Sequence, residues 1–248
     1  MQRLLLLIST VAFFSGCVTP HPVVKILPTE KVALISAIDA DMRGYKITFT
    51  IFGYKSWVAW HPGFDVNAIA LSTAKTVLNR EAKLVNGKDV GIALENVEPS
   101  YGPASDSSLL GIRDKLIILG QEWQVDRIIL LQSEVTSDWL NGRAINLLEG
   151  FGLCSQSEKG DASIYGNFLM RFFDCRTGQF FKFDSSADQA RPLPGVHWHD
   201  SWDAYTSEEK QTTARALGTL IKQSLPILLA KTGLTDIVSD RPTVDWKP

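Results

Sequence analysis

The repeated change of hydrophobic period along the chain constrains its fold more than any other feature of the sequence. Residues 31–38, KVALISAI, form an almost continuous apolar run of strand length, and residues 46–53 alternate apolar with polar side chains. Later segments place apolar residues at helical spacing, and the chain then returns to strand composition. Because both periods recur, the chain is expected to pack helices on a sheet.

Three amphipathic helices are predicted from capping residues and helical spacing. Asp65 can cap the first helix, and the second covers residues 105–120, with Gly120 placed to end it. Thr206 and Glu209 stand in capping-box spacing at the start of the third and longest helix.

Further strands are expected between these helices. A short strand is expected near residues 90–97, and a strand with an apolar centre at residues 128–131. Residues 164–184 predict a hairpin whose turn, residues 174–178, runs from an Asp to a Gly. The expected fold is α/β, a mixed β-sheet packed by about three helices with a β-hairpin before a long C-terminal helix.

Cys154 and Cys175 are expected to remain unpaired. An even thiol count in an oxidising compartment favours a disulfide. If residues 145–154 and 162–173 pair as a hairpin, however, Cys154 lies at its turn and Cys175 lies at its far end. At roughly 3.3 Å per residue their separation is about 40 Å, far beyond the limit of about 7 Å for bridgeable Cα atoms.

The amino terminus has the pattern of a bacterial lipoprotein signal. Arg3 precedes an apolar run, and the uncharged stretch, residues 4–18, has 15 residues, whereas a membrane span needs about 20. Two small residues then precede Cys17. The segment resembles the lipobox, whose Cys takes a diacylglycerol before cleavage on its amino side, although Phe14 replaces the usual Leu. We expect lipidation at Cys17; ordinary secretory cleavage and an uncleaved anchor are the alternatives.

These features define the expected domains and location. Residues 1–16 are the expected signal peptide, residues 17–30 the lipidated Cys and a Pro-containing tether, and residues 31–248 one domain with a short C-terminal tail. Several acyl chains hold such a protein at a membrane. Because Val18, and not the Asp that retains such lipoproteins in the inner membrane, follows the Cys, the resemblance implies the outer membrane, facing the periplasm.

The charge pattern gives no indication of nucleic-acid binding. Removing residues 1–16 removes one basic residue from the 25 Lys and Arg, against 27 Asp and Glu. The basic residues are scattered singly, so no phosphate-tracking surface is expected. The expected partners are the membrane, through the anchor, and another envelope protein.

The order of segments resembles a group of bacterial envelope lipoproteins. The segments are the lipobox, VALISAI (32–38), two amphipathic helices, DRIILLQSEV (126–135), and RFFDCRTGQFFKF (171–183) before the long final helix. The group includes the curli-secretion channel lipoprotein and domains similar to the amino-terminal domain of the Tol β-propeller protein. The resemblance implies a non-enzymatic role in the envelope. The chain lacks a long alternating segment suited to the membrane-spanning hairpin of a secretion pore.

Two groups of residues remain candidates for chemistry. Gly-x-Ser-x-Gly and phosphate-binding glycine patterns are absent from the sequence. Asp39 and Asp41 follow the first strand, where open α/β sheets bind ligands, although solvated loop acids are the simpler interpretation. The candidate ligands of a zinc-like metal are His61, His197, His199 and Asp200. Alternatively, the histidines cover the edge of an aromatic-rich loop.

Four tryptophans form either an exposed patch that binds a partner or part of the core. They are Trp57, Trp60, Trp198 and Trp202. The sequence therefore predicts a lipid-anchored periplasmic binding or assembly accessory protein of the cell envelope, non-enzymatic and without a cofactor. The alternative is a metal-dependent periplasmic hydrolase.

Overall fold

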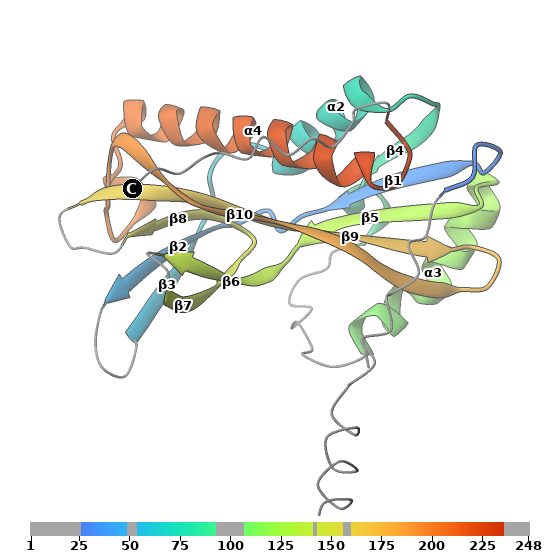
Figure 1. The fold of residues 1–248 in the computed structure, drawn as a ribbon, viewed down its shortest axis with the longest axis horizontal. Coiled ribbons are helices and arrows are strands. Elements are labelled where there is room, and N and C mark those ends of the chain that lie inside the picture. The colour runs from blue at the N-terminus through green and yellow to red at the C-terminus, as the bar shows by residue number, and fades with distance from the viewer. Residues whose placement is uncertain (1–25, 49–53, 93–106, 141–142, 156–159, 236–248) are drawn as a thin grey trace, which may run out of the picture.

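A computed structural model describes residues 26–48, 54–92, 107–140, 143–155 and 160–235. One mixed sheet extends through the molecule, with two helices on one face and one on the other (Figure 1). The predicted α/β class, with a mixed sheet and a long C-terminal helix, is confirmed. Cys17, the predicted signal peptide and the first part of the tether lie outside the described residues.

The helices and strands are labelled in Figure 1, where the colour runs from blue to red along the chain. The helices are α2 (Val66–Val77), α3 (Ser107–Trp123) and α4 (Ser207–Ala230), with short 3-10 turns η1 (Gly87–Val90) and η2 (Trp202–Ala204). The strands are β1 (Val32–Ala37), β2 (Met42–Thr48), β3 (Tyr54–Trp60), β4 (Ala82–Asn86), β5 (Arg127–Ser133), β6 (Val135–Leu140), β7 (Arg143–Glu149), β8 (Phe151–Ser155), β9 (Asp161–Asp174) and β10 (Gln179–His197).

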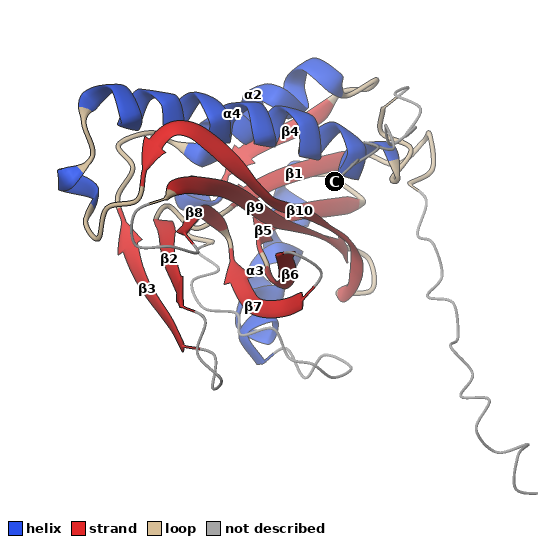
Figure 2. Cartoon of the chain, turned by 60° about the vertical axis from the view of Figure 1, so that its left-hand side comes forward, coloured by secondary structure: helices blue, strands red, loops and turns tan. Residues whose placement is uncertain are grey.

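The long strand β9 joins two halves of the sheet. Along one edge its later part pairs with β5, which continues to β1 and β4, and its earlier part pairs with β8, which continues to β2 and β3. Along the other edge β9 pairs with β10 (Figure 2). β9 is antiparallel to β5, β8 and β10, whereas β1, β4 and β5 are parallel to one another.

The β6–β7 hairpin leaves the sheet between these two halves. Asn167 marks the junction: its main chain accepts a bond from Glu134 N at 3.0 Å and donates to Gly150 O at 2.7 Å. Its side chain is buried and donates to Leu148 O at 2.8 Å. The expected pairing of residues 145–154 with β9 is therefore correct for β8 alone, because residues 145–149 belong to β7 and pair with β6.

The two faces of the sheet carry separate hydrophobic cores. α2 and α4 pack over one face, where Met170 and Phe172 of β9 meet Leu217 and Leu225 of α4. α3 covers part of the other face. The apolar centre of β5 is fully buried between these cores, as its composition predicts. None of the helices in the described residues is both long and apolar enough to cross a bilayer.

Gly120 does not end α3, contrary to the prediction. The helix continues to Trp123, and Gln124 then takes a positive φ of 52°. A Cβ at Gly120 would lie 2.6 Å from the sulfur of Cys175, so the glycine permits close packing of α3 on the β9–β10 turn. The strand expected near residues 90–97 is not formed at Val90, which ends η1; residues 93–97 lie outside the described residues.

The β9–β10 turn has the predicted geometry. The Asp174 carboxylate accepts bonds from Arg176 N and Thr177 N at 2.8 and 3.2 Å, and Gly178 has a φ of 66°. Cys175 follows β9 at this end, whereas Cys154 pairs with Ser163 near the other end. The two cysteines are not joined to each other in the structure, and the hairpin that separates them is present.

Candidate partner-binding site

The start of α4 is fixed by a capping box centred on Glu209. Thr206 Oγ1 accepts a bond from Glu209 N at 3.2 Å, and the Glu209 carboxylate accepts from Thr206 N at 2.9 Å. The same carboxylate accepts from His197 N at 3.0 Å and lies 3.5 Å from His199 Nε2. Burial opposes its charge, but these hydrogen bonds outweigh burial and lower the pKa of Glu209 to about 2. Glu209 therefore joins the end of β10 and the following loop to α4.

An aromatic cluster packs between β3 and this loop. We define it as Trp60, Trp198, Trp202 and Tyr205. The Trp60 ring lies 5.5 Å from Trp198, 6.0 Å from Trp202 and 5.6 Å from Tyr205, between ring centroids. Gly44 of β2 makes room for the Trp60 indole, because a Cβ there would lie 2.2 Å from it.

The cluster is buried at one side and partly exposed at the other. Trp60 and Trp198 are 4% and 8% exposed, whereas Trp202 is only partly buried. Lys210 of α4 places its amine 5.7 Å from the centroid of the Trp202 ring, a cation–π distance. The structure thus brings three of the four candidate tryptophans together, and Trp202 is the one at the surface. The side chain of Trp57 lies outside the described residues.

The candidate metal ligands are held by separate partners. His61 Nδ1 lies 3.3 Å from Asp41, and His197 Nδ1 lies 3.3 Å from Asp161. His199 faces Glu209 and Tyr205, while Asp200 accepts a bond from Trp198 Nε1 at 3.2 Å. Among the described residues, no three His, Cys, Asp or Glu side chains form a group able to hold a metal.

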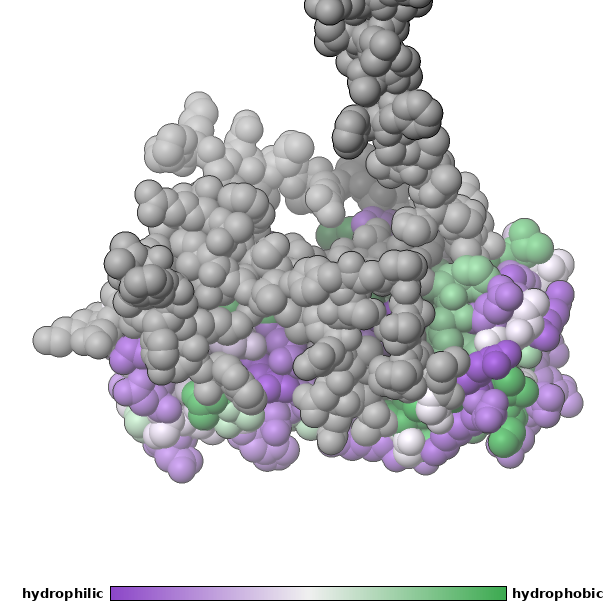
Figure 3. Space-filling model, turned by 90° about the horizontal axis from the view of Figure 1, so that it is seen from below, coloured by the Kyte–Doolittle hydropathy of each residue, from purple (hydrophilic) through white to green (hydrophobic). Residues whose placement is uncertain are grey.

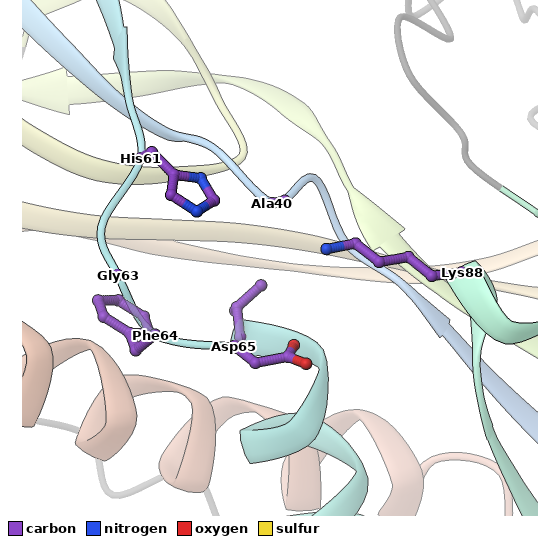
Figure 4. A pocket seen from close by; sticks show the side chains of 7 residues that line it. Ala40, His61, Gly63, Phe64, Asp65 and Lys88 are labelled. Atoms are coloured by element: carbon purple, nitrogen blue, oxygen red, sulfur yellow. The ribbon is translucent and has the colours of Figure 1, made fainter.

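A small pocket of about 210 Å³ lies near the start of α2, and its lining includes His61, the residue after Trp60. His61 and Lys88 reach toward it from opposite sides, and Phe64 and Asp65 lie along the segment that enters α2 (Figure 4). The Asp65 carboxylate already accepts bonds from Asn67 N and Ala68 N at 2.9 and 3.1 Å, so it caps the helix as predicted. A cap in this position occupies the end of the helix that would otherwise attract an anion.

The two acids after β1 have structural partners. Asp39 forms an ion pair with Arg43 at 3.1 Å, and Arg43 also lies 3.4 Å from Glu149. The main chain between β1 and β2 is held by Asn67, whose amide bonds both the nitrogen and the oxygen of Ile38. These contacts stabilise the turn between β1 and β2 and the place where β7 meets β8.

Sequence reasoning left Tyr205 out of the candidate site and missed the hydrogen bond between Glu209 and His197 N. Tyr205 is buried, its hydroxyl bonds the main chain of His199, and burial raises its pKa to about 12. Its place three residues after Trp202, in the same aromatic-rich loop, was the available signal. The second role of Glu209, on His197 N, depends on the approach of β10, which no local pattern shows.

Comparisons with known proteins find similarity at the level of structure. No family model matches the sequence, and no curated protein matches it. A PelC dodecamer from Paraburkholderia phytofirmans is 12% identical, with 82% of this chain and 86% of that chain covered and a TM-score of 0.33. The lipoprotein GNA1162 from Neisseria meningitidis is 12% identical, with 78% and 99% covered and a TM-score of 0.30.

A third similar structure is a protein of family DUF330 from Xanthomonas campestris. It is 9% identical, with 86% of this chain and 95% of that chain covered and a TM-score of 0.28. Similarities of this size carry no information about the function of this chain.

Proposed function

We propose that the chain is a lipid-anchored accessory protein of the bacterial envelope, facing the periplasm from the outer membrane, that acts by binding another envelope protein. The observation that supports its location is the apolar run that ends in Ser15-Gly16-Cys17. The observation that supports its binding role is the aromatic cluster, which reaches the surface at Trp202 beside an edge strand.

The edge strand supplies the second part of the proposed surface. β3 is last in the strand order, so none of the described strands pairs with its outer edge. Unpaired main-chain groups on such an edge can accept a partner strand, and side chains beside it give specificity. Trp60, the last residue of β3, contacts Trp202 directly, so the edge and the partly buried indole of Trp202 are neighbours. Tryptophan is also the residue type most enriched in interface hot spots.

Trp202→Ala tests the binding role. Affinity purification of the tagged full-length protein from cross-linked envelopes should recover a partner with the wild type and about thirtyfold less with Trp202→Ala, since truncation of a hot-spot residue costs about 2 kcal/mol. Trp123→Ala is the matched control, because Trp123 of α3 is also partly buried and has an amine, that of Lys83, 5.0 Å from its ring. Equal recovery with Trp202→Ala would contradict the proposed surface.

The anchor is tested separately at Cys17. A fatty-acid probe supplied to cells should label the wild type, and Cys17→Ser should lose the label and leave the membrane fraction. Equal labelling of the two proteins would remove the anchor from the proposal. Elemental analysis of the purified protein addresses catalysis: one equivalent of bound zinc per chain would favour a metal-dependent hydrolase over a binding protein.

A further inference from the structure

The amino-terminal turn is fixed at one end of the molecule. Residues 26–31 lie beside the carboxyl end of α4, on the right in Figure 1. Ile26 is 5% exposed and donates its N–H to Thr232 O at 3.4 Å. Ile26 therefore contacts the domain, although it lies within the segment that the sequence assigned to the tether.

Leu27 is held outward by this turn. Its N–H donates to the Glu30 carboxylate at 2.8 Å, and its carbonyl accepts from Glu30 N at 3.0 Å and from Arg80 Nη1 at 2.8 Å. Glu30 is itself buried and bound to Arg127 Nε at 3.1 Å. These bonds prevent the turn from rotating to bury Leu27, whose side chain stays 58% exposed.

Exposure of this kind is rare in the described part of the protein. Leu27 and Ile118 are the large apolar residues left exposed there, at 58% and 54%. On the part of the underside that Figure 3 draws in colour, hydrophobic residues are interspersed with hydrophilic ones. Leu27 differs from Ile118 in its neighbours. Exposed Lys31 lies within the same turn, and partly exposed Arg80 donates a hydrogen bond to the Leu27 carbonyl. An apolar side chain beside cationic ones suits the phosphate and acyl boundary of a bilayer.

The length of chain before Ile26 limits how far this end can be from the anchor. Nine Cα–Cα steps separate Cys17 from Ile26, which is about 30 Å when extended. α4 has 24 residues and is about 36 Å long, and it runs from the aromatic cluster to the end that carries Leu27 (Figure 1). The aromatic end therefore cannot face the membrane while the Leu27 end points away from it.

We propose that the end centred on Leu27 rests on the lipid surface and that the aromatic cluster and the start of α4 point away from the membrane. This inference rests on the lipidation of Cys17 given as the proposed function. It adds an orientation: the bilayer contact is made by Leu27 with Lys31 and Arg80, and the proposed partner surface is presented to the periplasm at the opposite end.

Site-specific fluorophores test the orientation in the full-length lipidated protein. Leu27→Cys, Ile118→Cys and Asp203→Cys each place one exposed thiol, at the proposed contact, on α3 and at the far end. Each protein is labelled with a maleimide fluorophore and reconstituted into phosphatidylethanolamine–phosphatidylglycerol vesicles with and without a nitroxide lipid labelled near the headgroup. The unsubstituted protein gives the background, which should be small because burial raises the pKa of Cys175 to about 11.

The expected result is strong quenching at position 27, by about half or more, and little at position 203. Equal quenching at 27 and 203, or quenching at 118 that matches 27, means that the molecule lies on its side, and the orientation is then wrong. Vesicle flotation separates the two ideas. If the wild type does not float with vesicles, the lipidation is wrong and the orientation falls with it; if it floats and the three positions are quenched equally, the orientation alone fails.

Discussion

Glu209 joins three segments of the chain through one carboxylate. Its oxygens accept hydrogen bonds from Thr206 and His197, so the start of α4, the end of β10 and the loop between them share a single acidic group. Hydrogen bonds to the charged form lower a carboxyl pKa. Since the pKa of Glu209 falls to about 2 in the folded protein, against about 4.3 in an unfolded chain, folding favours the ionised form.

We predict a pH-dependent loss of stability from this group. The stabilisation is complete above about pH 4.5 and is lost as the pH falls toward 2, because the unfolded chain takes up the proton first. Glu209→Gln should lower the free energy of unfolding by about 1–2 kcal/mol at pH 7 and by much less at pH 3. Urea denaturation at both pH values measures this, and a difference that is the same at pH 3 and pH 7 would contradict it.

Gly178 is a second residue whose backbone limits substitution. Its φ of 66° is strained for residues with a Cβ, and a Cβ there would lie 3.0 Å from Arg113 Nη2 and 3.3 Å from Ile117 Cδ1. Gly178→Val should therefore destabilise the protein by about 1–2 kcal/mol or more and lower its melting temperature. Gly218→Ala of α4 is the control: it has no atom within 4 Å of the new Cβ and should leave the melting temperature equal or higher. An unchanged melting curve for Gly178→Val would count against the turn.

At the scale of elements, two glycines in α3 should respond in opposite directions. A Cβ at Gly120 meets Cys175 at 2.6 Å, whereas one at Gly111 meets nothing within 4 Å. Gly120→Ala should cost about 1–3 kcal/mol through overpacking, and Gly111→Ala should stabilise by about 0.5–1 kcal/mol through helix propensity. Thermal unfolding of the two variants distinguishes them; stabilisation by both would mean that α3 does not pack on the turn as described.

The β8–β9 hairpin leads to a prediction about thiols. Cys154 pairs with Ser163, and Cys175 follows the end of β9, about 40 Å away at roughly 3.3 Å per residue. Denatured but unreduced Cys17→Ser protein from the periplasm should therefore titrate with two free thiols per chain. A count of zero would mean that residues 151–175 fold in another way.

Which elements could be predicted depended on whether their cause was local. Asp65 and the pair Thr206 and Glu209 start helices through contacts within three residues, so sequence spacing was sufficient. The packing of Gly120 depends on Cys175, which is far away in sequence, so the glycine was mistaken for a helix stop. Residues 145–149 have strand composition, but composition does not select a partner, and β6 pairs with them instead of β9.

The candidate site shows the same limit. The sequence offered a shared patch of tryptophans as one alternative and burial in the core as the other, and Trp60 does contact both Trp198 and Trp202. Their exposure could not be predicted, because it depends on how Tyr205 and the capped helix close over the cluster. The histidines likewise pair with carboxylates from different elements, a result of tertiary packing that their i,i+2 spacing does not contain.

At the scale of the whole molecule, β9 determines whether the two halves of the sheet unfold together. Between Leu169 and Phe173 it is paired with β5 on one edge and β10 on the other, and between Ser163 and Gly166 it is paired with β8 and β10. Strands paired on both edges and buried on both faces open only with the global transition, whereas edge strands open locally at lower free energy.

We therefore predict that hydrogen exchange is slowest in β9 and equal in its two parts. Peptides from β3 and β4, which lie at the ends of the strand order, should exchange at least about tenfold faster, corresponding to about 1.4 kcal/mol or more in opening free energy. Exchange followed by mass spectrometry on the intact protein gives both quantities in one experiment.

Slow exchange confined to the part of β9 that pairs with β5 would mean that the β8–β2–β3 half opens alone, and that β9 does not couple the two halves. Equal protection in both parts would instead place the proposed partner surface, at the β3 end, on the less stable margin of a cooperative sheet, where a partner strand could add to β3 without opening the core.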